Sequence, residues 1–209
     1  MKSIYGLVLI VLVQFSCKNE VLNAFEEANQ SLLDSIAIYD TLNSHLFEQL
    51  DPNALKMRKA EGEFSALVYY GFKKQNQAID RVIQLISEKA VNRNDRTVST
   101  RYLVKAGKAE EIRAETNDLL LYAESESPHD YDLPEAAKQL IWSINDYEKS
   151  DNETWAESQF LNMPMIASKS LLNRFKLNNC KASALILLDL KQKIIYDKNN
   201  NSVIDNESE

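Results

Sequence analysis

The sequence predicts an all-α protein: an elongated up-and-down bundle of about five helices, with an N-terminal signal or anchor segment and a disordered acidic tail. Two observations predict this class. Only four Gly and four Pro occur in 209 residues, which leaves few turn signals for the hairpins of a β-sheet. Apolar residues also recur at alternating spacings of three and four from Leu22 to Leu50, as in a helix that packs along a long partner.

The N-terminal segment, residues 1–16, has the pattern of a secretory signal. A basic start precedes the apolar run 4–13, which is shorter than the roughly 18 residues of a membrane-spanning helix. Ser16-Cys17 is typical of the end of a bacterial lipoprotein signal, so we expect Cys17 to be lipidated as the first residue of the mature chain. Gln14 departs from the aliphatic residue usual at the third position before that Cys. A retained membrane helix and a plain cleaved signal are the alternatives.

The first helix of the bundle is predicted over 22–50. Leu22 and Phe25 begin its apolar stripe. Asn29 and Asn43 fall on the same seam, where they either set the register through hydrogen bonds or face a wet end of the bundle. Both interpretations are structural.

Two further long helices follow. Asp51-Pro52 is a stop-and-restart signal, with Asp as a possible N-cap, and predicts a second helix over 52–90. The polar stretch 92–96 is aperiodic and predicts a loop. A third helix is expected from about Ser99 to Glu124.

The remaining elements are shorter until the last helix. A break at 125–133 precedes a helix that Pro134 begins and that includes Tyr147. After a polar break at 149–153 comes a linking segment, in which we expect Trp155 and Phe160 to be buried anchors. Pro164 begins the last long helix, to about Tyr196. The bundle therefore covers 17–196, and the Asn-rich, acidic stretch 197–209 is expected to be disordered.

Charge restricts the partners. The chain carries a net charge of −7, which argues against nucleic acid, because binding a polyphosphate needs clustered Lys and Arg. No polybasic patch is expected either, so membrane attachment is assigned to the lipid alone.

The sequence holds no recognisable catalytic constellation. The two histidines, His45 and His129, lack zinc-ligand spacing, and no nucleophile elbow or phosphate-binding loop occurs. Cys180 is interpreted as a small residue of a helix. We therefore predict no catalytic residue, no cofactor and no enzyme activity. A weak EF-hand-like match places oxygen-bearing side chains at Asp197, Asn199, Asn201 and Asp205, but it lacks the turn Gly and the bidentate Glu, so no metal site is predicted.

Two segments resemble the first periplasmic domain of the gliding-motility GldM (PorM) family. Residues 20–25, followed by Asn29 and Leu32, are similar to the stretch just after that family's transmembrane helix. Trp155 and then 160–164 resemble the Trp and Phe-x-x-x-Pro entry into the last long helix of that domain. The resemblance covers most of 18–196 and implies an all-helical bundle.

The resemblance also implies partners. Members of that family form dimers whose membrane helix sits inside a partner membrane protein, and together they drive gliding and type IX secretion. This chain departs from them at Ser16-Cys17 and in lacking the later β-sandwich domains, so motor activity is not expected.

The expected function is a non-catalytic helical interaction module in the cell envelope. It would be lipid-anchored to a bacterial membrane, facing the periplasm or the cell surface, with protein partners or a second copy of itself. The rivals are a single-span inner-membrane component packing against a motor membrane protein and, with least support, an exported enzyme.

Overall fold

The computed structural model describes residues 2–50, 55, 57–129, 131–143 and 153–206. Within these ranges, side chains are described from residue 19 to residue 199. Its elements are α1 (Lys2–Gln49), α2 (Lys59–Lys89), the π-helical turn η1 (Ser99–Lys105), α3 (Lys108–Ser125), α4 (Glu135–Trp142), α5 (Trp155–Phe160) and α6 (Met165–Asn206). No strand occurs among the described residues. The predicted all-α class is confirmed.

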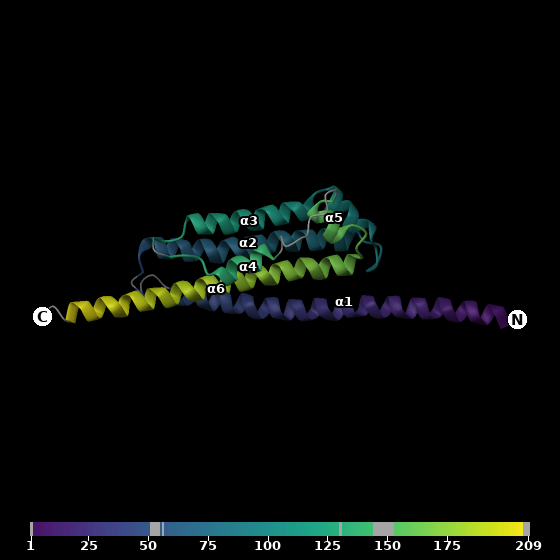
Figure 1. The fold of residues 1–209 in the computed structure, drawn as a ribbon, viewed down its shortest axis with the longest axis horizontal. Helices are drawn as coiled ribbons and strands as arrows, with labels where there is room; N and C mark the ends of the chain where they lie inside the picture. The colour runs from purple at the N-terminus through teal and green to yellow at the C-terminus, as the bar shows by residue number, and fades with distance from the viewer. Residues whose placement is uncertain (1, 51–54, 56, 130, 144–152, 207–209) are drawn as a thin grey trace.

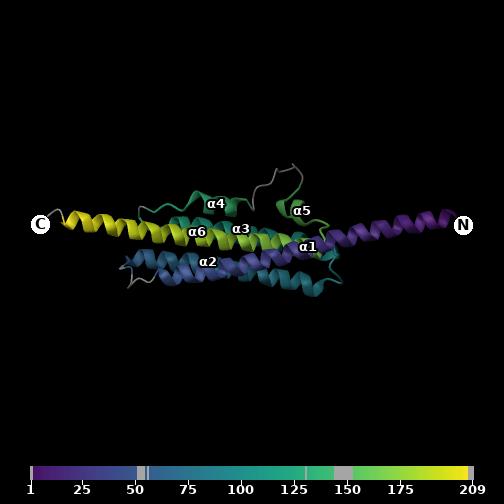
Figure 2. The same cartoon turned by 90° about the horizontal axis from the view of Figure 1, so that it is seen from below.

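The helices form an elongated up-and-down bundle (Figure 1). α1 and α6 lie side by side and run in the same direction, while α2 runs antiparallel to both, and α3 packs on α2 (Figures 1 and 2). Two hydrogen bonds show the parallel register. Ser170 Oγ donates to the carbonyl of Phe25, and Lys191 Nζ donates to Gln49 Oε1 farther along both helices.

The predicted apolar seam of α1 is the face that packs on α6. Leu22, Ile36 and Leu46 are buried, and Phe25 is half-buried. The N-terminal part of α1 continues beyond the bundle as the same helix (Figure 1). Within the described ranges, no helix contains a stretch long and apolar enough to cross a membrane.

Two predicted boundaries in the middle of the chain differ from the structure. α2 begins at Lys59, and just before it the backbone N–H of Arg58 donates to Glu61 Oε2. The predicted start, Asp51-Pro52, lies outside the described residues. The predicted third helix is divided into η1 and α3 at Gly107, whose φ of +71° ends one helix and admits the next.

The last helix is longer than predicted. The stretch from 197 was expected to be disordered, but α6 continues through it to Asn206. Neither Gly nor Pro interrupts the helix between 197 and 206. Residues 207–209 lie outside the described residues, as do Tyr147 of the predicted fourth helix and most of the break at 149–153.

The core is divided along the bundle. One large apolar cluster lies around Phe64, Phe72 and Leu187, and its residues come from α1, α2, α3, α4 and α6 and the loop before α4. The other lies around Ile79, Trp155 and Phe175, and its residues come from α2, η1, α3, α5 and α6 and from Val98 before η1. Along α2 the first cluster ends at Phe72 and the second begins at Ile79. The turns between them carry polar side chains.

Candidate functional site

Cys17, the predicted lipidation site, lies on α1 five residues before Leu22. Leu22 is the first buried residue for which α1 has a described side chain. At about 1.5 Å per residue, only about 8 Å of helix separates the two Cα atoms. The predicted anchor point therefore connects to the bundle through helix, without an intervening loop.

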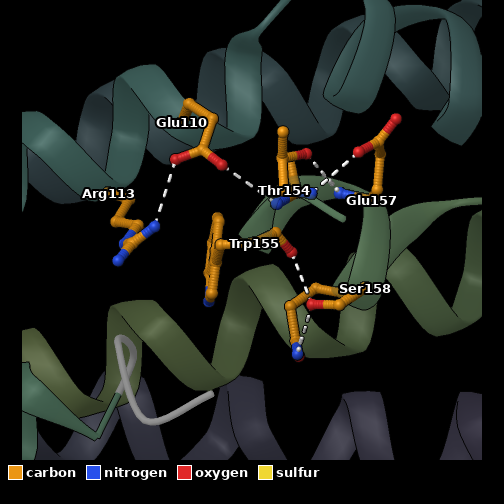
Figure 3. Close-up of polar contacts among 8 residues, drawn as sticks. Glu110, Arg113, Thr154, Trp155, Glu157 and Ser158 are labelled. Atoms are coloured by element: carbon orange, nitrogen blue, oxygen red, sulfur yellow. Dashed lines mark hydrogen bonds and ion pairs between the residues drawn. The ribbon is translucent and has the colours of Figure 1, made fainter. Parts of the chain in front are cut away.

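The entry to α6 is organised by α5 (Figure 3). Thr154 and Glu157 form a capping box at its start: Thr154 Oγ1 accepts from the N–H of Glu157 at 3.2 Å, and Glu157 Oε2 accepts from the N–H of Thr154 at 2.8 Å. Hydrogen bonding to Thr154 lowers the pKa of the Glu157 carboxyl. This cap determines where the short helix begins and so where Trp155 points.

Trp155 and Phe160 are buried, as the sequence predicts. The Trp155 ring packs against Phe160 and Phe175 with centroid distances of 5.9 and 5.8 Å, and the Arg113 guanidinium lies 5.3 Å from its centroid. Glu110 accepts from the N–H of Ala156 at 3.0 Å, which joins α3 to α5 (Figure 3). These contacts stabilise the fold.

Pro164 precedes α6, and its carbonyl accepts from the N–H of Ser168. The next two residues are held by the loop after α2: the N–H of Met165 donates to the carbonyl of Asp95, and that of Ile166 donates to the carbonyl of Arg93. This pairing of α6 with the distant loop is not evident in the sequence.

Between the two cores, α1, α2 and α6 bring together buried polar side chains, here called the polar layer. Its members are Asn43, Asn76, Lys176, Asn179 and Cys180. Asn43 Nδ2 donates to the carbonyl of Cys180 at 2.9 Å, and Asn179 Nδ2 donates to Asn76 Oδ1 at 3.0 Å. Each bond joins two helices, so the polar layer aligns α1 and α2 with α6.

A cavity of about 270 Å³ lies beside the polar layer, between α1, α2 and α6. Lys176 Nζ pairs with Asp80 Oδ1 at 2.5 Å on its wall. Asn43 Oδ1, also on the wall, is buried and has no hydrogen-bond partner among the described residues. Its lone pairs are therefore available to a water molecule in the cavity.

Cys180 is held as a neutral thiol in this layer. Its Sγ donates to Asp40 Oδ1 at 3.2 Å and accepts from Asn76 Nδ2 at 3.0 Å. Burial, together with the Asp40 carboxylate, raises the pKa of the thiol from 9.0 to about 12. A thiol that stays protonated at neutral pH is a poor nucleophile, so Cys180 is a structural residue.

We expect Cys180 in the folded chain to resist thiol reagents at pH 8, and to react rapidly once denaturant is added. The raised pKa also makes a pH prediction. Above pH 9 the thiol of the unfolded chain loses its proton, while the thiol of the folded chain keeps it. The free energy of unfolding should therefore fall as the pH rises from about 9 to 12. Mass-resolved labelling with and without denaturant measures the first effect; equal rates in both conditions would contradict the buried placement.

A second hollow lies between α1, α4 and α6, here called the apolar groove, with a volume of about 330 Å³. Its lining residues are Tyr39, Leu42, Leu46, Leu140, Lys181, Ala184, Leu185 and Leu188. Leu42 and Leu188 are exposed. An exposed apolar hollow of this kind suits an apolar side chain of a protein partner.

The residues considered for catalysis or metal binding are dispersed. His45 and His129 are both exposed, on α1 and in the loop after α3. α6 includes the four residues of the EF-hand-like match, Asp197, Asn199, Asn201 and Asp205, so their backbone is helical and does not form a loop. The side chains of Asn201 and Asp205 lie outside the described residues. No group of three or more His, Cys, Asp or Glu among the described residues is placed to hold a metal ion.

Asn43 was predicted from the sequence to lie on the seam, but its partners in the polar layer were not predicted. A sequence pattern that could have predicted them is present in α6, where the polar residues Asn173, Lys176 and Asn179 recur three residues apart on a buried face.

The sequence matches no known family model and no curated protein.

Proposed function

We propose that this chain is a membrane-attached, non-catalytic interaction module of the bacterial cell envelope, with Cys17 as its lipid anchor. The observation that carries the proposal is the continuity of α1, which runs as one helix through Cys17 into the bundle. Acyl chains on Cys17 would thus hold the bundle directly at the membrane surface, each buried CH₂ contributing about 0.8 kcal/mol.

The sides of the bundle would then be presented to other proteins of the envelope. The apolar groove supports this part of the proposal, because it leaves Leu42 and Leu188 exposed between three helices. The resemblance of residues 20–25 and 160–164 to the GldM family favours a partner in gliding motility or type IX secretion. Motor activity is not part of the proposal.

The anchor is tested by Cys17→Ser. If Cys17 is lipidated, the substitution should abolish acylation and normal processing. The result is an uncleaved precursor, heavier by the 16 signal residues, about 2 kDa at ~110 Da per residue, less the lost lipid. Intact mass of the membrane-extracted protein measures cleavage and acylation together.

Ser16→Ala is the matched control, because Ala is a small residue and should leave processing unchanged. Unchanged mass and membrane fractionation in Cys17→Ser would reject the lipid anchor. That outcome would favour the rival in which the N-terminal segment is retained as a helix beside a motor membrane protein.

A further inference from the structure

A basic segment lies at one end of this acidic protein. Residues 89–108 contain six basic side chains and one acidic residue, Asp95, for a net charge of +5. Since the whole chain carries −7, the remainder carries −12. The basic residues are Lys89, Arg93, Arg96, Arg101, Lys105 and Lys108. The expectation that the chain has no polybasic patch is therefore wrong, because the net charge of the whole chain conceals this segment.

The fold places this segment at the end of the bundle from which the N-terminal part of α1 projects (Figures 1 and 2). Arg93 forms an ion pair with Glu26 of α1 at 2.7 Å. Glu26 lies nine residues after Cys17, which is about 14 Å along the helix. The opposite end of the bundle, where α6 continues, is remote from the anchor (Figure 1).

Several of the charges at this end are not neutralised by neighbours. Lys89, Arg96 and Lys105 are exposed and form no ion pair with the residues that the structure describes. The carboxylate of Asp95 is turned into its own loop, where it accepts from the N–H groups of Val91 and Thr97. Lys108 is paired with Glu111, and Arg93 with Glu26.

Exposed apolar side chains accompany these charges. Val91 is 88 % exposed in the loop that follows α2, between Lys89 and Arg93 in the sequence. Leu161 is also exposed, and the adjacent Asn162 N–H donates to Thr100 Oγ1 of η1 at 3.0 Å, which places Leu161 at the same end. Exposed aliphatic residues among basic ones are typical of a surface that rests on a lipid interface.

We infer that this end of the bundle is a binding surface for anionic phospholipid head groups. The basic segment contacts the bilayer and holds the bundle upright on it, with Val91 at the interface. The inference rests on the proposed anchor at Cys17, which brings the segment near the surface. Electrostatic attraction acts over about 8 Å at physiological ionic strength, so the short helical connection between Cys17 and Leu22 is needed for the contact.

The test uses the full, acylated chain carrying Val91→Cys, labelled with an environment-sensitive fluorophore. Acylation blocks Cys17 and burial protects Cys180, so the label attaches at position 91. The chain is reconstituted in vesicles of phosphatidylcholine with or without phosphatidylglycerol, both containing lipid spin-labelled at the head group. Tyr196→Cys, an exposed position near the opposite end, is the matched labelling site.

We expect quenching at position 91 on anionic vesicles, loss of that quenching on neutral vesicles, and none at position 196. The triple variant Lys89→Gln, Arg96→Gln, Lys105→Gln should lose the quenching. The variant Lys59→Gln, Lys74→Gln, Lys193→Gln removes the same number of positive charges elsewhere and should keep it. Circular dichroism checks that both variants fold.

Two failures are distinguishable. Vesicles that carry the chain but give equal quenching at 91 and 196, or quenching that ignores lipid charge, would overturn the inference and leave the anchor intact. A chain that does not float with either kind of vesicle would reject the anchor at Cys17, and with it the inference.

Discussion

Replacing Trp155 with alanine should lower the free energy of unfolding by about 3 kcal/mol. The ring is only 4 % exposed, and its contacts with Phe160 and Phe175 join α5 to α6. Truncation removes this apolar burial and leaves a cavity that the capped α5 is poorly able to close. Denaturant unfolding followed by circular dichroism measures the change.

Trp142 provides the matched control, because its side chain is 44 % exposed on α4. Trp142→Ala should change the free energy of unfolding by less than about 0.5 kcal/mol. Trp155→Phe should cost less than Trp155→Ala, since a smaller ring still fills part of the site. A loss below about 0.5 kcal/mol for Trp155→Ala would show that the ring is exposed and that α5 does not anchor α6.

The second large effect concerns the seam between α1 and α6. Asn173 Nδ2 donates to Asn29 Oδ1 at 2.6 Å, and both residues are buried. Asn173→Leu should cost roughly 1–3 kcal/mol of unfolding free energy, because Asn29 is left buried without its donor. The double variant Asn29→Leu, Asn173→Leu should recover most of that loss, since neither polar group then remains.

A double-mutant cycle by denaturant unfolding separates these effects. Asn23→Leu, on the exposed side of α1, is the control and should be nearly neutral. If the single and double variants lost the same stability, the two amides would not be coupled, and the register of α1 on α6 would depend on other contacts.

Much of the fold was predictable from local pattern. The seam from Leu22 to Leu50 predicted α1 to within one residue of its end at Gln49, and Pro164 predicted the start of α6 at Met165. The start of α2 was missed. Its cap uses Arg58 and Glu61, a pair without the Ser or Thr by which a capping box is recognised in a sequence.

The candidate sites were predicted less completely. Asn29 and Asn43 were recognised on the seam because they interrupt an apolar period. Their partners Asn173 and Cys180 lie more than 130 positions away, so no local pattern connects them. The basic segment 89–108 was not predicted, because the net charge of the whole chain conceals it, and its closeness to the N-terminal part of α1 depends on contacts such as Arg93 with Glu26.

The sequence by itself determined that the chain is helical and which face of the 22–50 helix is apolar. Both follow from short-range properties: scarce Gly and Pro, and the 3.6-residue period that places every third or fourth side chain on one face. Only the tertiary structure decided that α1 lies parallel to α6, that buried amides align in a polar layer, and that the basic segment lies at the end from which the N-terminal part of α1 projects. The physical reason is that apolar faces pack with little selectivity, whereas buried polar groups must meet partners brought from distant parts of the chain.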